Sequence, residues 1–294
     1  MATESLRHPT FRTAYWSDPG ARQAFRDFIL RIHRVDFGAW ERAGYWDDDY
    51  RPYSYFVGEQ VVANVCIYTM PALVDGQACR VAQVSGVGTL PEYRLRGLNR
   101  RLHQVALADA LPHHRFVFLH ADEEAVPFYR KCGFRPVQAH ALVLPLPPAA
   151  PDRNMEKLDV EDPAVRDALY RLACARAPVS RSFSTMNAKL LMYHLLYRLR
   201  DHAWRIPSLD AVALMKRDAV RPVLYDILAR DLPRLGPLAP YLAADGAREV
   251  EIRFPQDQLG APAGELRELH GQNVHVMGEF ELGKRPVFPF TSQA

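Results

Sequence analysis

Two arginines and a glycine separate an extended segment from a helical one in the first third of the chain. The loop reads Arg94-Leu-Arg-Gly-Leu-Asn99. Residues 81–89 before it are rich in β-branched and small side chains, which predicts a strand. Apolar residues at positions 98, 102, 105 and 106 after it have helical spacing. Free N–H groups at the start of that helix and the helix dipole would converge on one point, so the loop predicts a phosphate site.

A second group of aromatic and glycine residues follows. Residues 116–120, with the sequence FVFLH, predict a short buried strand, and residues 126–134 contain Phe128, Tyr129, Gly133 and Phe134. On the residues alone, Tyr129 is equally a core tyrosine whose hydroxyl is satisfied by a neighbour.

The two segments together resemble the GCN5-related N-acetyltransferases, the GNAT superfamily. The signature of that family at the loop is Gln/Arg-x-x-Gly-x-Gly/Ala, and Arg94, Gly97 and Asn99 fall on its fixed positions. Asn99 departs from the pattern, and its larger side chain would crowd a pyrophosphate there. Residues 128–134 reproduce the family's Phe-Tyr-x-x-x-Gly-Phe in the expected order.

The resemblance implies acetyl-coenzyme A as co-substrate. Strand 81–89 would splay from its neighbour, so that its free backbone groups pair with the pantetheine arm, and the N–H of Val87 would polarise the thioester carbonyl. The backbone amides of residues 95–100 would hold the pyrophosphate. The implied coenzyme-binding residues are Val87, Gly88, Thr89, Arg94, Leu95, Arg96, Gly97, Leu98, Asn99, Arg100, Asp122 and Tyr129. No metal is expected, because the histidines lack metal-ligand spacing.

The family pattern places the general acid at Tyr129, which would protonate the departing thiolate. A tyrosine pKa of about 10 is close to the roughly 8.5 of a thiol, so little tuning is expected. Gln83 and Ser85 share one face of strand 81–89 where some relatives keep histidines, and could hold a water for proton removal. Asp122 either contacts pantetheine or caps the helix of Tyr129.

The last ten residues are rich in proline and aromatic side chains. Phe288 and Phe290 would be costly to leave in water, so residues 285–294 are expected to dock on the molecule. The segment resembles the closing segment of multidomain acetyltransferases in which the terminal carboxylate is the base. This implies a catalytic carboxylate at Ala294; the alternative is plain packing of the segment on the second domain.

Three acidic residues provide a candidate for acceptor binding. Asp47, Asp48 and Asp49 lie among aromatic residues in the segment that forms the acceptor wall in this fold. They would suit a cationic amine. A solvated acidic turn is the competing interpretation.

Composition is that of a soluble globular protein. The chain has 294 residues, of which 48% are apolar and 24% charged, with a net charge of +3. That charge gives no reason to expect nucleic acid, and no apolar run approaches the roughly 18 residues of a membrane span. The N-terminus lacks an apolar signal core and four cysteines lack paired spacing, so a cytoplasmic protein with reduced thiols is expected.

The order of predicted elements is β-α-α-β-β-β-α-β-α-β. It fits an α/β fold of the GNAT type, with a mixed, mostly antiparallel sheet and helices on both faces. We expect a GNAT domain over residues 1–146, a proline-rich linker at 147–153 and a second domain over 154–294. The helix-helix-strand-strand-helix-strand order of that domain resembles the degenerate second domain of tandem acetyltransferases, although an unrelated α/β cap would give the same pattern.

We therefore expect an N-acetyltransferase that moves an acetyl group from acetyl-coenzyme A to a primary amine of a small molecule, either aminoglycoside-like or an amino-acid derivative. The alternatives are a protein N-acetyltransferase and a non-catalytic module that senses acetyl-coenzyme A. Neither nucleic acid nor a membrane is expected as partner, and a homodimer is left open.

Overall fold

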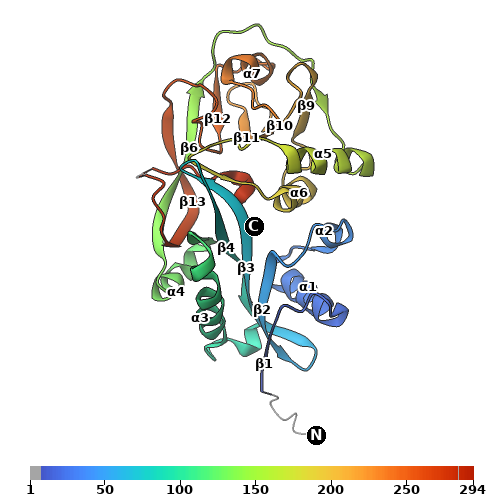
Figure 1. Ribbon diagram of the computed structural model, residues 1–294, viewed down its shortest axis with the longest axis vertical. Coiled ribbons are helices and arrows are strands. Elements are labelled where there is room, and N and C mark those ends of the chain that lie inside the picture. The colour runs from blue at the N-terminus through green and yellow to red at the C-terminus, as the bar shows by residue number, and fades with distance from the viewer. Residues whose placement is uncertain (1–7, 284) are drawn as a thin grey trace.

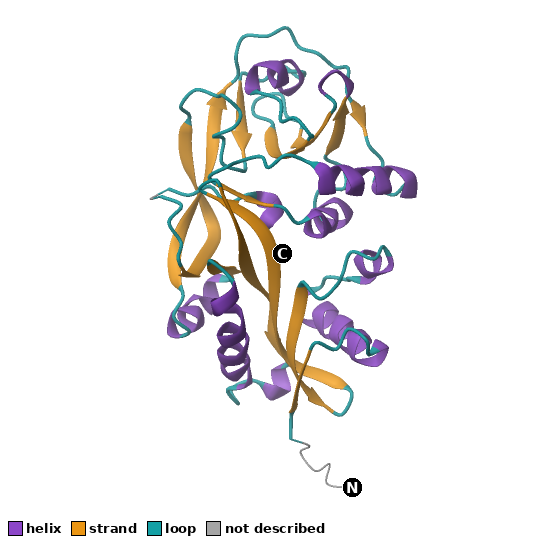
Figure 2. Cartoon of the chain, viewed as in Figure 1, coloured by secondary structure: helices purple, strands orange, loops and turns teal. Residues whose placement is uncertain are grey.

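The computed structural model describes residues 8–283 and 285–294. Residues 1–7, where the sequence gives no export signal, lie outside the described residues. The strands of the described part join in one 13-stranded sheet (Figures 1 and 2). Its path is β1-β2-β3-β4-β5-β13-β6-β12-β11-β10-β9-β7, and β8 pairs with β3.

The first half of the chain has the predicted order of helices and strands. Short 3₁₀ turns link some of them. In sequence the elements are β1 (Thr10–Thr13), α1 (Pro19–His33), α2 (Gly38–Arg42), β2 (Tyr50–Val57), β3 (Gln60–Val74), β4 (Gln77–Thr89), α3 (Leu98–Ala110), β5 (Phe116–Ala121), α4 (Val126–Lys131) and β6 (Arg135–Pro145). Figure 1 shows α3 and α4 on one side of the sheet and α1 and α2 on the other. The mixed, mostly antiparallel sheet with helices on both faces is therefore confirmed.

The second half adds a smaller layered unit. Its elements are β7 (Glu156–Lys157), α5 (Pro163–Ala175), β8 (Phe183–Thr185), α6 (Ala188–Tyr197), β9 (Ala203–Ile206), β10 (Ala211–Lys216), β11 (Val223–Leu228), α7 (Leu235–Leu242), β12 (Glu249–Ile252) and β13 (Glu265–Gly278). The consecutive strands β10 and β11 pair antiparallel. A separate apolar core forms where Leu142 and Leu144 of β6 meet α7 and β10–β12.

Strand β13 was not predicted from the sequence. Although it comes late in the chain, it lies between β5 and β6 and pairs antiparallel with both. Polar residues such as Glu265, Arg267 and Glu268 interrupt its apolar alternation, and its register shifts after Glu268. The division of the chain at residues 147–153 stays a prediction, and the strand pairing adds that residues 265–278 lie within the sheet of the first half.

A bulge in β4 prepares the site. Between Ser85 and Gly88 this strand has one residue more than the opposite stretch of β3, and Gly86 has φ +57°. A Cβ at Gly86 would meet the Tyr50 hydroxyl at 3.0 Å and the Cys66 sulfur at 3.2 Å, so glycine fits both the angle and the space. The Asn64 side-chain amide donates to the Gly86 carbonyl over 2.8 Å and fixes the bulge.

None of the helices in the described part of the chain combines the length and the apolar character that crossing a membrane requires.

Candidate active site

A polar cavity of about 380 Å³ lies at the splay of β4 and β5. The two strands pair in parallel only at Ala82–Val117 and Gln83–Phe118, and beyond this point β4 leaves β5. The lining consists of His33, Gln83, Val84, Ser85, Gly86, Val87, Asn99, His120, Asp122, Ala125, Phe128, Tyr129 and Ala294. The structure therefore brings together seven of the predicted site residues: Gln83, Ser85, Val87, Asn99, Asp122, Tyr129 and Ala294.

The basic loop adjoins this cavity through Asn99. Gly97 has φ +73° and directly precedes α3, whose N-terminus has no side-chain cap. A Cβ at Gly97 would meet nothing within 4 Å, so the surface above the helix start is open. Arg94 and Arg96 are exposed and bond only backbone oxygens, those of Thr89 at 3.2 Å and Glu92 at 2.9 Å.

The positive charges of the loop are therefore available to an anion. Neither arginine forms an ion pair within the described chain. The cavity lining does not include Leu95, Leu98 or Arg100, whose expected contribution is through their backbone amides. Leu95 is fully exposed and has φ +62°.

Asn99 turns its side chain toward the end of β4. The amide nitrogen donates to the Gly88 carbonyl over 2.7 Å and to the Thr89 hydroxyl over 2.8 Å. The oxygen of the same amide is buried and has no partner among the described residues. The Asn99 amide thus satisfies acceptors at the end of β4. Gly88 and Thr89 hold this side chain but are not part of the cavity lining.

Gln83 and Ser85 both form hydrogen bonds with protein groups in the cavity lining. The Gln83 side chain donates to the Ala294 carbonyl over 3.1 Å and accepts from the Ala294 N–H over 2.7 Å. Ser85 donates to the buried Tyr50 hydroxyl over 3.0 Å. Both side chains thus bond protein groups, and their role in holding a water stays a prediction.

The C-terminal segment is buried, as its aromatic residues predicted. Phe288 packs against Phe118 of β5 and Phe183 of β8, with ring centroids 5.8 Å apart in both pairs. The 3₁₀ turn η5 (Phe290–Ser292) is held by Ser292, whose hydroxyl lies 2.7 Å from that of Thr185. This packing brings residue 294 to the cavity.

The Thr291 hydroxyl donates to the buried carboxylate of Asp226. That carboxylate lies 2.7 Å from the buried Arg176 guanidinium, close enough for an ion pair although poorly aligned for a hydrogen bond. A buried charge pair in the second half of the chain therefore anchors the segment that reaches the cavity.

The acidic cluster lies outside the lining of this cavity. Asp47 forms an ion pair with Lys189 at the start of α6 and accepts from the Asp49 N–H over 3.1 Å. Burial raises the pKa of Asp49. The ion pair of Asp47 with Lys189 links the first half of the chain to the second. A role of Asp47, Asp48 and Asp49 in binding the acceptor stays a prediction.

Asp122 lines the cavity and makes no side-chain cap. The interpretation that it caps the Tyr129 helix is wrong, because the 3₁₀ turn η3 (Glu123–Ala125) intervenes and is closed by the backbone bond from Ala125 to Asp122. Burial raises the pKa of Tyr129, and the Asp122 carboxylate adds to that rise. Burial lowers the pKa of His33, and the same carboxylate opposes that fall.

Two histidines of the cavity, His33 and His120, escaped the sequence interpretation. His33 ends α1, and His120 ends the apolar run of β5. The sequence did carry a signal for His120, because it is a polar residue near the end of an apolar strand that precedes the helix of Tyr129. The described residues hold no cluster of three or more His, Cys, Asp or Glu side chains suited to a metal ion.

Comparison with known proteins identifies the fold around this cavity. A family model described as an acetyltransferase (GNAT) domain matches residues 32–137, the segment that carries the bulge, the loop and Tyr129. Residues 32–137 therefore form a GNAT domain. The match to an acetyltransferase domain makes the protein an acyltransferase. A search of curated protein sequences found no match.

Solved structures of similar fold cover most of this GNAT chain. They include a conserved protein of unknown function from Enterococcus faecalis (TM-score 0.58, 13% identity, 91% of this chain and 72% of that one). Eis1 from Mycobacterium abscessus has a TM-score of 0.56 and 18% identity over 92% of this chain and 73% of its own. A GCN5-related N-acetyltransferase from Kribbella flavida has a TM-score of 0.54 and 17% identity over 91% and 71%. At these identities the likeness concerns the fold alone.

In this GNAT domain the pKa of Tyr129 is higher than expected from the sequence. Burial, and then the charge of Asp122, raise its pKa well above the ordinary value. The phenol therefore stays protonated at all physiological pH values, as a general acid must. The expected close match to a thiol is not met in the free enzyme, and proton transfer to sulfur is more uphill than that match implied.

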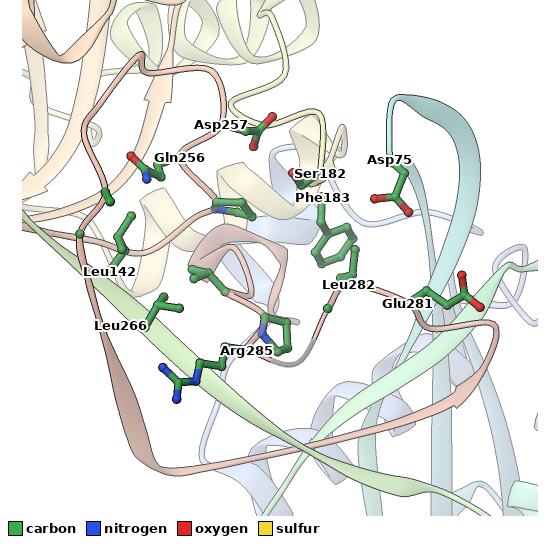
Figure 3. A pocket seen from close by; sticks show the side chains of 16 residues that line it. Asp75, Leu142, Ser182, Phe183, Gln256, Asp257, Leu266, Glu281, Leu282 and Arg285 are labelled. Carbon is green, nitrogen blue, oxygen red and sulfur yellow. The ribbon is translucent and has the colours of Figure 1, made fainter.

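A second cavity, of about 510 Å³, lies away from this site (Figure 3). Asp75 and Glu281 lie at one end of it and Leu142 and Leu266 at the other. Asp257 in its wall already accepts from the Ser180 hydroxyl over 2.5 Å and from the Arg181 N–H over 2.7 Å. Its lining includes neither the basic loop nor Tyr129, so we do not assign it to acetyl transfer.

Proposed function

We propose that the cavity binds acetyl-coenzyme A and transfers its acetyl group to the primary amine of a small molecule. The observation that carries the proposal is the splay of β4 from β5. The bulge at Gly86 and the side chains of Tyr129 and Asn99 surround one polar cavity at that splay. The open strand edge suits the amide groups of pantetheine.

The coenzyme would enter along β4 toward the start of α3. Uncapped N–H groups at that helix start, with the exposed Arg94 and Arg96, suit a pyrophosphate. The buried, unpartnered oxygen of Asn99 is an acceptor for an amide N–H of pantetheine. At the bulge, the Val87 N–H would stabilise the oxyanion of the tetrahedral intermediate, a donor worth about 3 kcal/mol of barrier.

The acceptor would lie on the face of Gln83 and Ser85. The C-terminal segment forms one wall of the cavity, since Ala294 lines it and makes two hydrogen bonds to the Gln83 side-chain amide. A wall at this place supports a small acceptor rather than a peptide, which needs a groove. A cationic acceptor would find one acidic side chain in the described lining, that of Asp122.

Tyr129 would protonate the departing sulfur. In a chain that ends at Ala294, the terminal carboxylate would stand beside Gln83, where it could remove the amine proton. Its role as base therefore stays a prediction that depends on a free end at this residue.

The test is a thiol-release assay with acetyl-coenzyme A over three panels of acceptors: small amines, including amino-acid derivatives and an aminoglycoside; peptides with a free N-terminus; and peptides with a lysine. Release with small amines alone supports the proposal. Release only with peptides would favour a protein N-acetyltransferase. Binding of acetyl-coenzyme A by calorimetry, without release in any panel, would favour a sensing module.

A further inference from the structure

His120 occupies a specific place relative to the splay of the two strands. Gln83 and Phe118 are paired neighbours in parallel strands, so the next residues on the same face are Ser85 on β4 and His120 on β5. Both line the cavity, together with Tyr129. The His120 ring thus faces the acceptor side of the opening through which the thioester must be reached.

The position of the ring is fixed by its surroundings. Its centroid lies 6.0 Å from that of Phe118 and 6.3 Å from that of Phe288. The backbone of His120 pairs with Val274 of β13, which limits motion of the strand end. An imidazole so held can present a nitrogen in one direction.

One ring nitrogen lacks the partner that buried polar atoms normally have. Nε2 of His120 is buried without a hydrogen-bond partner among the described residues. Leaving such a group unpaired costs free energy, and binding sites are where such costs are met by a ligand. A small amine held beside the thioester would supply the missing partner.

The charge state suits an acceptor of protons. Burial, and then the positive charge of Arg198, lower the pKa of His120 to about 4, so the imidazole is neutral at pH 7. The other titratable groups around it are Asp122, His33 and Tyr129 of the same cavity, with Ala294 beyond Gln83. A neutral ring can accept a proton at once, although the low pKa makes it a weak base.

We propose that His120 takes up the proton of the attacking amine, an inference that rests on the proposed function. The amine nitrogen bonds to the carbonyl carbon of the thioester, and its proton passes to the imidazole. The C–S bond then breaks with its electron pair on sulfur, which takes the Tyr129 proton. The imidazolium returns a proton to the phenolate, directly or through water, so the site is restored.

This assignment differs from a terminal carboxylate as the base, because His120 lies within the chain and does not need a free end at Ala294. The group at residue 294 then has a structural task, which is to hold Gln83 through its two backbone bonds. The two assignments predict opposite results for two variants.

The experiment measures thiol release from acetyl-coenzyme A with the best amine of the small-amine panel. His120→Gln, which cannot take up a proton at neutral pH, should lower kcat by about 10²–10⁴-fold with unchanged coenzyme affinity by calorimetry. Added imidazole should restore part of the activity of His120→Ala, which a purely structural role would not produce. Three glycines added after residue 294 should leave most of the activity.

His275→Gln is the matched control. His275 lies on the neighbouring strand, is 2% exposed and also has an unpartnered Nε2, but it pairs with Leu119 and is outside the cavity lining. Its turnover should stay near that of the parent.

Three outcomes would overturn the inference. His120→Gln could keep its kcat within threefold of the parent, His120→Ala could show no rescue by imidazole, or the glycine extension alone could abolish turnover. Absence of thiol release by the parent enzyme with every amine would overturn the proposed function and the role of His120 with it.

Discussion

Asn99 shows how one side chain adapts a signature. The family pattern has Gly or Ala at this position, whereas here the Asn99 amide turns toward the end of β4. Its bonds to the Gly88 carbonyl and the Thr89 hydroxyl satisfy groups at the end of that strand. The side chain thereby joins strand and helix, and its free oxygen remains for a ligand.

Tyr129→Phe keeps the ring and removes only the hydroxyl. We expect kcat to fall by about 10²–10⁴-fold, because a general acid is lost, while coenzyme affinity and the melting temperature change little. Steady-state thiol release and calorimetry measure the two effects. If kcat drops less than threefold in conditions where chemistry limits the rate, Tyr129 has a packing role.

At the scale of elements, the strand-loop-helix unit is the part that sequence reasoning predicted well. Local signals specify it: a β-branched run before the loop, glycine at a positive φ, and helical spacing after it. The role of Tyr129, by contrast, came from the resemblance to the family motif, because the residues alone allowed a core tyrosine equally well. The bonding of Gln83 to residue 294 was out of reach, because it joins positions 211 residues apart and no local pattern encodes it.

Gly97→Glu tests this unit as the coenzyme site. It places a carboxylate above the uncapped helix start, so the Kd for acetyl-coenzyme A should rise by at least tenfold through charge repulsion. Gly271→Glu is the control: Gly271 has φ +79° against +73° for Gly97, and a Cβ at either meets nothing within 4 Å. Equal affinities of the two variants, measured by calorimetry, would remove the loop from coenzyme binding.

The anchor of the C-terminal segment makes a second prediction at this scale. Arg176→Met leaves the Asp226 carboxylate buried without its partner and should lower the free energy of unfolding by about 3–5 kcal/mol. Arg205→Met breaks an exposed pair with Glu156 and should cost about 1 kcal/mol or less. Urea unfolding of both variants makes the comparison. Similar small losses would mean that the buried pair does not hold the segment.

The molecule as a whole carries several neutral histidines in its interior. Burial lowers the pKa of His103 to about 4, of His120 to about 4 and of His194 to about 3. In the unfolded chain the pKa of each histidine is close to its ordinary value of about 6.5. Below that pH the unfolded chain therefore binds more protons than the folded protein. Stability from these groups is complete above about pH 6.5 and is lost as the pH falls toward 4.

The expected loss is about 1.4 kcal/mol per pH unit for each histidine, or roughly 4 kcal/mol per unit for three, between about pH 6 and pH 4. Urea midpoints at half-unit steps measure it. His194→Leu removes one of the three groups and should flatten the slope by about a third. A midpoint that is constant from pH 7 to pH 5 would show that these rings are charged or solvated in the fold.

The position of β13 has a consequence for synthesis on the ribosome. Strands β5 and β6 emerge more than a hundred residues before β13, yet each needs β13 as its neighbour. Until then both present unpaired edges, which are templates for association with other chains. The pocket wall that contains His120 is therefore completed only after β13 has been synthesised. A fragment stopped after residue 146 should be aggregation-prone, and a separate peptide of residues 260–294 should rescue its solubility by filling the gap.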